Sequence, residues 1–124
     1  MQIQFFDDPA DMFKARDDVR IKDIVTEVSP EGRRVSVGFD LTPFRDRPSL
    51  DVVIVNAEGE IAGNITVIET LAHQFILIIH IRDKNPTTRY DVFTELFYTG
   101  EPGDPRQVID RHQTEFTIPE ASID

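Results

Sequence analysis

A repeated pattern dominates this chain: a short run of β-branched and aromatic residues is followed by a cluster of Pro, Gly, Asn, Asp or Ser. Runs of this length are typical of β-strands, and the clusters between them are typical of turns. Seven such runs follow one another, at 19–28, 34–41, 50–56, 61–68, 73–82, 90–99 and 106–118. The intervals leave no room for crossover helices, so the sequence predicts antiparallel sheets.

The alternation inside the runs predicts local detail. Between Ile21 and Ile24 the alternation slips, which indicates a β-bulge. Turn residues at 56–60 predict an antiparallel hairpin between the third and fourth runs. The fifth run is apolar on both faces, so we expect it to lie centrally in its sheet. The seventh run is interrupted by polar residues at 110–113, which predicts an edge strand with a bulge or an exposed middle.

Strands of this number and spacing favour two antiparallel sheets packed face to face. The chain resembles the immunoglobulin-like class, including fibronectin type III modules, in strand number and in Tyr90-Asp91-Val92 near the start of the sixth run. In that class a tyrosine corner occupies this position. The resemblance implies an all-β immunoglobulin-like (fibronectin III-like) β-sandwich of about seven strands. A small closed β-barrel is the alternative, because it has the same alternation.

We expect residues 1–124 to form a single domain, in which residues 1–18 are an N-terminal extension that packs on the sandwich or on a partner. Within that extension, Asp8 followed by Pro9 is typical of a helix start. The sequence therefore predicts a short helix from Pro9 to about Arg16. Asp7, Asp8 and neighbouring acids lack the spacing of a calcium-binding loop, so helix capping and solvation explain them better.

Charge and composition exclude several classes of function. With 13 basic and 23 acidic residues the net charge is −10, which opposes binding to nucleic acid or to an anionic membrane. The absence of Cys excludes disulfides and thiolate zinc sites. The longest apolar run, 75–79, is far shorter than the roughly 20 residues of a membrane-spanning helix. With no secretory signal in the printed sequence, we expect a soluble cytoplasmic protein.

The chain shows no motif for catalysis. Its serines lie outside any GxSxG pattern, and no glycine-rich phosphate loop is present. We therefore expect no enzyme activity and no cofactor. His80 and His112 would approach each other only if their strands were neighbours, and ordinary strand histidines explain them better than a metal site.

One end of the predicted sandwich collects the loops at 43–49, 70–72 and 100–105. These loops carry a candidate binding cluster suited to an acidic or planar partner: Phe44, Arg45, Arg47 and Arg106. We favour a more conservative interpretation, in which Phe44 folds back over the core and the arginines pair with nearby acids. Those acids are Asp46, Glu101 and Asp104.

The third, fifth and sixth runs carry more apolar residues than a sandwich core requires. We expect one sheet to be apolar on its outer face, lined by Val53, Val55, Ile76, Ile78, Phe93 and Phe97. Either the N-terminal segment, through Phe5, Phe6, Met12 and Phe13, or a second copy in a twofold dimer would cover this face.

This apolar excess favours a non-catalytic protein-interaction or assembly module that self-associates through the sheet face. The loop end with Phe44 and Arg45 is a second candidate surface of the same module. The alternative is a small-ligand or metal-binding β-domain that uses an inter-sheet pocket or the His80/His112 pair.

Overall fold

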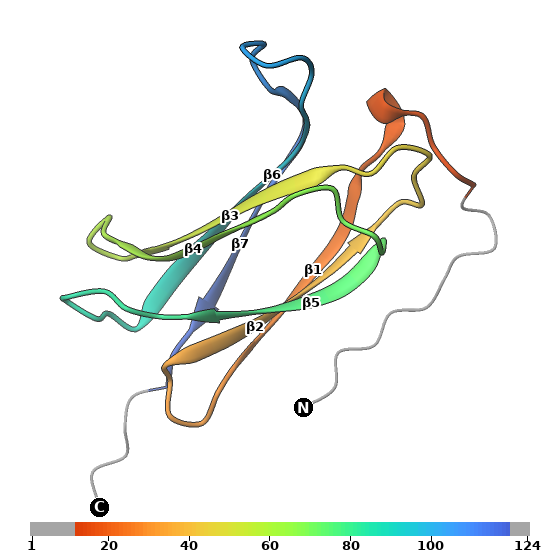
Figure 1. Ribbon diagram of the computed structural model, residues 1–124. Helices are drawn as coiled ribbons and strands as arrows, with labels where there is room; N and C mark the ends of the chain where they lie inside the picture. The colour runs from red at the N-terminus through yellow and green to blue at the C-terminus, as the bar shows by residue number, and fades with distance from the viewer. Residues whose placement is uncertain (1–11, 120–124) are drawn as a thin grey trace, which may run out of the picture.

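The computed structural model describes residues 12–119, in which seven strands form two antiparallel sheets packed face to face (Figure 1). The first sheet has the order β1-β2-β5, with β1 at Ile21–Val28, β2 at Arg34–Leu41 and β5 at Gln74–His80. The second has the order β4-β3-β6-β7, with β3 at Ser49–Asn56, β4 at Ile61–Val67, β6 at Arg89–Tyr98 and β7 at Gln107–Thr117. The predicted immunoglobulin-like β-sandwich is confirmed. The barrel alternative is wrong, because no pairing among the described strands joins the two sheets.

The strand registers confirm the predicted irregularities. Ile21 pairs with Leu41 and Asp23 pairs with Asp40, so β1 carries one extra residue where the alternation slips. A second shift in the pairing of β6 with β7 lies near residue 109, and β7 is an edge strand as predicted. The hairpin between β3 and β4 is antiparallel.

The core lies between the two inner faces, where the alternating apolar residues of the strands meet. Its fully buried members include Val35, Val37, Phe39 and Leu41 from β2, and Leu50, Ile54, Val92 and Leu96 from the second sheet. Each such side chain contributes roughly 1.5–3 kcal/mol through burial. The alternating apolar residues therefore bury their side chains between the two sheets, and this burial is the main hydrophobic contribution to the stability of the fold.

Tyr90 forms the corner that the resemblance implies. Its hydroxyl accepts a hydrogen bond from the backbone N–H of Thr87 at 3.2 Å and donates one to Asp83 at 3.0 Å. Its ring stacks on Phe116, with 5.2 Å between the centroids. Burial, followed by the bond to Asp83, raises the pKa of Tyr90 above its ordinary value. The corner thus ties the start of β6 to the loop that precedes it.

The fifth strand departs from expectation. The prediction that it lies centrally is wrong, because β5 pairs only with β2 among the described strands and forms the edge of its sheet. Its outward residues Ile76 and Ile78 are exposed. Apolar side chains on both faces indicated burial on both sides, but neither another layer nor a second neighbour is present in the described chain.

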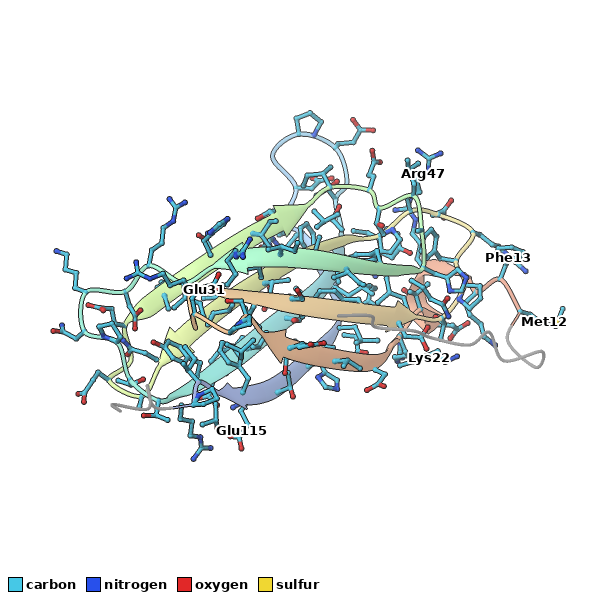
Figure 2. All side chains as sticks on the ribbon, turned by 90° about the horizontal axis from the view of Figure 1, so that it is seen from below. Met12, Phe13, Lys22, Glu31, Arg47 and Glu115 are labelled. Carbon is cyan, nitrogen blue, oxygen red and sulfur yellow. The ribbon has the colours of Figure 1, made fainter. Side chains whose placement is uncertain are left out.

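The predicted helix is also wrong where the structure describes it. Met12 to Ala15 are not helical, and Lys14 instead forms a parallel bridge with Phe44. One 3₁₀ turn, η1, follows at Arg16–Asp18. Figure 2 shows Met12 and Phe13 projecting from one end of the molecule, 72% and 68% exposed, so they do not cover a sheet face.

The expected cover by Phe5 and Phe6 lies outside the described residues, as does the part of the predicted helix before Met12. No helix in residues 12–119 has the length and apolarity that a membrane span requires.

The connections gather at two ends, as expected. At one end the backbone N–H of Thr70 donates to the carbonyl of Pro48 at 2.9 Å, which joins the loops that follow β4 and β2. At the other end Asn56 donates through Nδ2 to Asp83 at 2.8 Å, which joins the β3–β4 turn to the loop after β5. These bonds hold the loop residues of each end in fixed positions.

Candidate functional site

The predicted cluster at the loop end is divided between different places. Phe44 is half-buried against the core, in agreement with the more conservative interpretation, and its neighbour Arg45 donates its backbone N–H to the carbonyl of Lys14 at 3.0 Å. Arg45 and Arg47 are exposed and line one pocket. Arg106 lines a different one, on the outer face of the four-stranded sheet. The four residues therefore do not surround a common exposed aromatic.

Arg106 makes contacts that the sequence did not indicate. It forms ion pairs with Asp51 and with Glu95, the latter at 3.8 Å, and Glu95 also pairs with Arg111 at 3.0 Å. The expected pairing of Arg106 with Glu101 or Asp104 is wrong. Asp104 instead accepts a hydrogen bond from the backbone N–H of Glu101 at 3.2 Å, within the loop after β6.

Asp51 has an altered acidity at this network. Burial acts to raise the pKa of its carboxyl group, but hydrogen bonds from Arg106 and Thr66, together with the charge of Arg106, leave the pKa below its ordinary value. The hydroxyl of Thr66 donates to the carboxylate at 2.5 Å. Asp51 is therefore held in its ionised form on the sheet surface.

The outer face of the four-stranded sheet is less apolar than predicted. Val53 lies opposite Phe93 in the pairing of β3 with β6, and Val53 and Val55 are half-buried. Phe97 is only 2% exposed because Arg106 covers its ring, whereas Phe93 remains 41% exposed. Of the four predicted residues on this face, Phe93 is the one that stays widely accessible.

Ile76 and Ile78 lie elsewhere. They belong to β5, which pairs with β2, so they lie on the outer face of the three-stranded sheet beside Gly38 and Ser36. The expectation that six apolar residues share one sheet face is wrong. The alternation shows which residues share a face of one strand, but it does not show which strand is the neighbour.

The two candidate histidines do not meet. His80 pairs with Arg34 at the end of β5, and His112 pairs with Thr94 in the middle of β7, in the other sheet. Their strands are not neighbours. Across residues 12–119 no three His, Cys, Asp or Glu side chains come together in an arrangement that could hold a metal ion. The histidines therefore form no common site.

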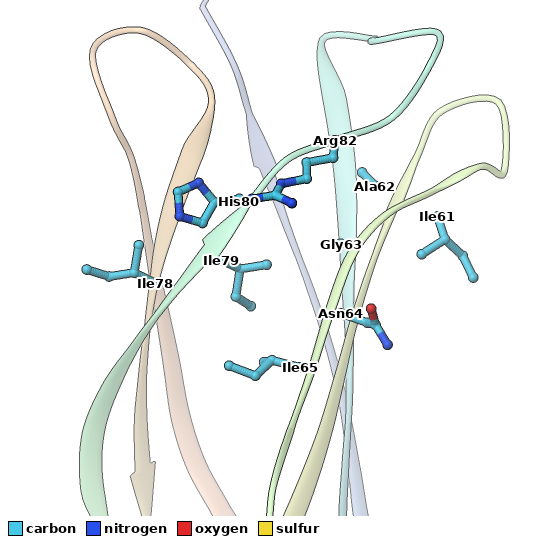
Figure 3. Close-up of a pocket in the computed structure, with 9 residues that line it drawn as sticks. All are labelled: Ile61, Ala62, Gly63, Asn64, Ile65, Ile78, Ile79, His80 and Arg82. Atoms are coloured by element: carbon cyan, nitrogen blue, oxygen red, sulfur yellow. The ribbon is translucent and has the colours of Figure 1, made fainter.

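A pocket of about 430 Å³ opens between the edge strands β4 and β5 (Figure 3). Its lining includes four isoleucines, Ile61, Ile65, Ile78 and Ile79, together with polar residues such as Asn64, His80 and Arg82. In Figure 3, Ile65 and Ile79 point toward one another between the strands. The backbone N–H of Arg82 donates to the carbonyl of Ala62 at 2.7 Å and closes one end.

Gly63 permits this close approach of the two strands. A Cβ atom at this position would lie 2.8 Å from the carbonyl oxygen of His80 and 2.9 Å from Cγ2 of Ile79. Such distances are shorter than van der Waals contact, so a larger residue would push β4 and β5 apart. The distance between β4 and β5, at the seam where the two sheets meet, thus depends on the absence of a side chain at Gly63.

Sequence reasoning missed the charge distribution around this seam. From Ile61 to His80 the only charged residue is Glu69, in a chain that is 29% charged. The edge strands on the opposite side differ, since β1 carries Lys22, Asp23 and Glu27, and β7 carries Asp110, Arg111 and Glu115. A scan of charge along the chain would have found this segment, which we name the β4–β5 side (residues 61–80).

Comparisons with known proteins add little beyond the fold. No protein-family model matches the chain, and no curated protein sequence does. Among solved structures it is similar to part of the β-glucuronidase from Ruminococcus gnavus in complex with D-glucuronic acid, with 16% identity and a TM-score of 0.47.

Another structure of the same enzyme gives 18% identity and a TM-score of 0.43. In both cases the match covers 82% of this chain and 16% of that chain. A likeness of this size carries no argument about the activity of this chain.

Proposed function

We propose that this chain is a non-catalytic interaction module that self-associates through its β4–β5 side. The observation that carries the proposal is the contrast between the two pairs of edge strands. Edge strands that must stay unpaired are usually protected by charged residues or proline. The strands β1 and β7 have such protection, whereas β4 and β5 contain neither a charged residue nor a proline.

The charge of the chain favours a second copy as the partner at this side. Two copies that each carry a net charge of −10 repel one another over most of their surfaces. At the β4–β5 side this repulsion is weakest, because Glu69 is its single charged residue. Depletion of charge is also the property that distinguishes the centre of a protein interface from other surface.

Exposed apolar side chains are concentrated on the same side. The exposed large hydrophobic residues between 61 and 80 are Ile61, Ile68, Leu71, Ile76 and Ile78. Outside this side, the described residues expose four others: Met12, Phe13, Val25 and Phe93. Of these, Val25 shares the outer face of the three-stranded sheet with Ile76, on the other side of Gly38. Removing such side chains from water on association would supply the main driving force.

The edge of β5 offers a simple geometry for a twofold dimer. An antiparallel pairing of two β5 strands centred on Leu77 would set Ile76 of one protomer opposite the partner's Ile78. Backbone hydrogen bonds at Ile76 and Ile78, away from the His80 carbonyl that Gly63 approaches, would then join the three-stranded sheets of the two copies. Because both residues lie on the outer face, the new contact would be apolar and self-complementary.

The test is the mass of the protein in solution. Light scattering after size-exclusion chromatography, at two protein concentrations, should give a species of twice the chain mass of 14.2 kDa for the unmodified chain. Ile78→Lys places a charge at the centre of the proposed interface, where Ile78 is 59% exposed, and should give the monomer mass.

Phe93→Lys is the matched control. Phe93 is also an exposed apolar strand residue, but it lies on the outer face of the other sheet. This variant should remain dimeric. A monomeric unmodified chain at the higher concentration, or equal dissociation by the two lysine variants, would overturn the proposal.

A further inference from the structure

A second pocket lies at the end of the molecule where the loops after β2 and β4 meet the end of β6. Its volume is about 300 Å³. All of its lining residues are polar or charged: Arg16, Arg45, Asp46, Arg47, Ser49, Glu69, Tyr98 and Thr99. Figure 2 shows Arg47 projecting at this part of the surface. Three arginines therefore gather around one small hollow in an acidic chain.

One of the three arginines, Arg16, already has partners within the pocket lining. Arg16 pairs with Asp46 at 3.0 Å and lies over the ring of Tyr98, with 4.8 Å between Cζ and the centroid. The hydroxyl of Tyr98 donates to the backbone carbonyl of Asp46 at 2.8 Å. These contacts fix the position of the loop segment that carries the other two arginines.

Arg45 and Arg47 have no side-chain partner among the residues that the structure describes. Acidic residues outnumber basic ones by 23 to 13 in this chain. Among the described residues Arg33 and Arg82 also form no side-chain ion pair, but they do not line this pocket. Arg34, Arg89 and Arg111, by contrast, each form an ion pair. Two unpaired guanidinium groups among the lining residues of one pocket leave donors that are not satisfied by the protein.

Glu69, another lining residue of the pocket, is held in place by its backbone. Glu69 has a φ of 49°, in the left-handed region that non-glycine residues rarely adopt. Its N–H donates to the hydroxyl of Ser49 at 3.0 Å, which fixes this conformation. Residues held in rarely populated backbone conformations cluster at active sites and ligand-binding sites.

We propose that this pocket binds the oxyanion group, carboxylate or phosphate, of a small ligand through Arg45 and Arg47. The planar guanidinium group donates two parallel hydrogen bonds to such a group, and two neighbouring arginines neutralise its charge. The Arg16–Asp46 pair leaves Arg45 and Arg47 opposed only by Glu69, so the unpaired charge at the pocket is positive. The pocket lies at the loop end, and its binding does not require the proposed dimer.

The experiment measures the thermal unfolding midpoint of the full chain with inorganic phosphate in one arm and acetate in the other. Sodium chloride keeps the ionic strength constant, so that general screening does not change between samples. A ligand that binds the folded state raises the midpoint with its concentration until the site is filled. We expect the unfolding midpoint to rise and then level off with phosphate, with acetate or with both. The anion that raises the midpoint is the one that the pocket binds.

Two double variants distinguish binding at the pocket from a general effect of net charge on the unfolding midpoint. Arg45→Gln with Arg47→Gln should abolish the rise. Arg33→Gln with Lys84→Gln removes the same amount of charge from exposed residues that line neither this pocket nor the one between β4 and β5, and should leave the rise intact. No saturable rise in either arm, or an equal loss in both double variants, overturns the inference.

Discussion

Arg106 lies over the ring of Phe97, with 4.0 Å between its Cζ atom and the ring centroid. A guanidinium group at this distance is attracted by the face of the ring and also shields it from water. The ion pairs with Asp51 and Glu95 keep the arginine in place. This contact converts an aromatic residue of the outer sheet face into a buried one.

Phe97→Ala should therefore destabilise the protein strongly. Removal of a buried aromatic ring costs about 3 kcal/mol or more, whereas Phe93→Ala on the same face should cost about 1 kcal/mol, as is usual for partly exposed positions. Urea unfolding of both variants gives the comparison. An equally small decrease in the free energy of unfolding for both variants would contradict the burial of Phe97.

The lowered pKa of Asp51 makes part of the stability dependent on pH. Its pKa in the folded state lies below the ordinary value of 3.8, so the ionised carboxylate stabilises the fold above that pH. The contribution is lost as the pH falls through the folded-state pKa. The free energy of unfolding of the unmodified chain should exceed that of Asp51→Asn at pH 7, and the difference should shrink at low pH.

Arg106→Gln provides the control for this pH effect. Without the guanidinium group, the titration midpoint of Asp51 measured by NMR should move upward, toward or above its ordinary value. A constant difference in stability between pH 7 and low pH, or an unmoved midpoint in Arg106→Gln, would contradict the assignment.

The Tyr90 corner gives a third prediction. Tyr90→Phe removes the hydroxyl that accepts from the N–H of Thr87 and donates to Asp83. The N–H of Thr87 then loses this acceptor, whereas Asp83 keeps the hydrogen bond from Asn56. The expected loss of stability is about 1–2 kcal/mol. Tyr98→Phe removes a single bond to the exposed loop residue Asp46 and should cost less. Thermal unfolding of the two variants tests this order.

A fourth prediction concerns the seam between β4 and β5. Gly63→Ala adds a methyl group that meets the backbone of His80, and overpacking of this kind costs about 1–3 kcal/mol. Asn64→Ala, at the exposed neighbouring residue, should change the stability by about 0.5 kcal/mol or less. Chemical denaturation measures both, and a neutral Gly63→Ala would show that the strands do not approach as closely as described.

Much of the fold could be predicted because its signals are local. The alternation of Val35, Val37 and Phe39 identified a strand and its inner face, and the slip after Ile21 located a bulge. The place of Tyr90 near the start of the sixth run predicted the tyrosine corner, and the hydrogen bond from Thr87 is part of that corner. The candidate site was harder to predict, because the alternation of apolar residues within one strand carries no information about which edge of the sandwich lacks charge.

The sequence by itself determined the seven strands, their buried faces and the two ends where the loops gather, because side-chain alternation and turn residues act within a few residues. Only the tertiary structure decided that β5 joins β2 at a sheet edge, that Arg106 covers Phe97, and that Arg45 and Arg47 share a pocket. Each of these depends on segments far apart in the chain, and the choice among such partners is made by packing and charge in three dimensions.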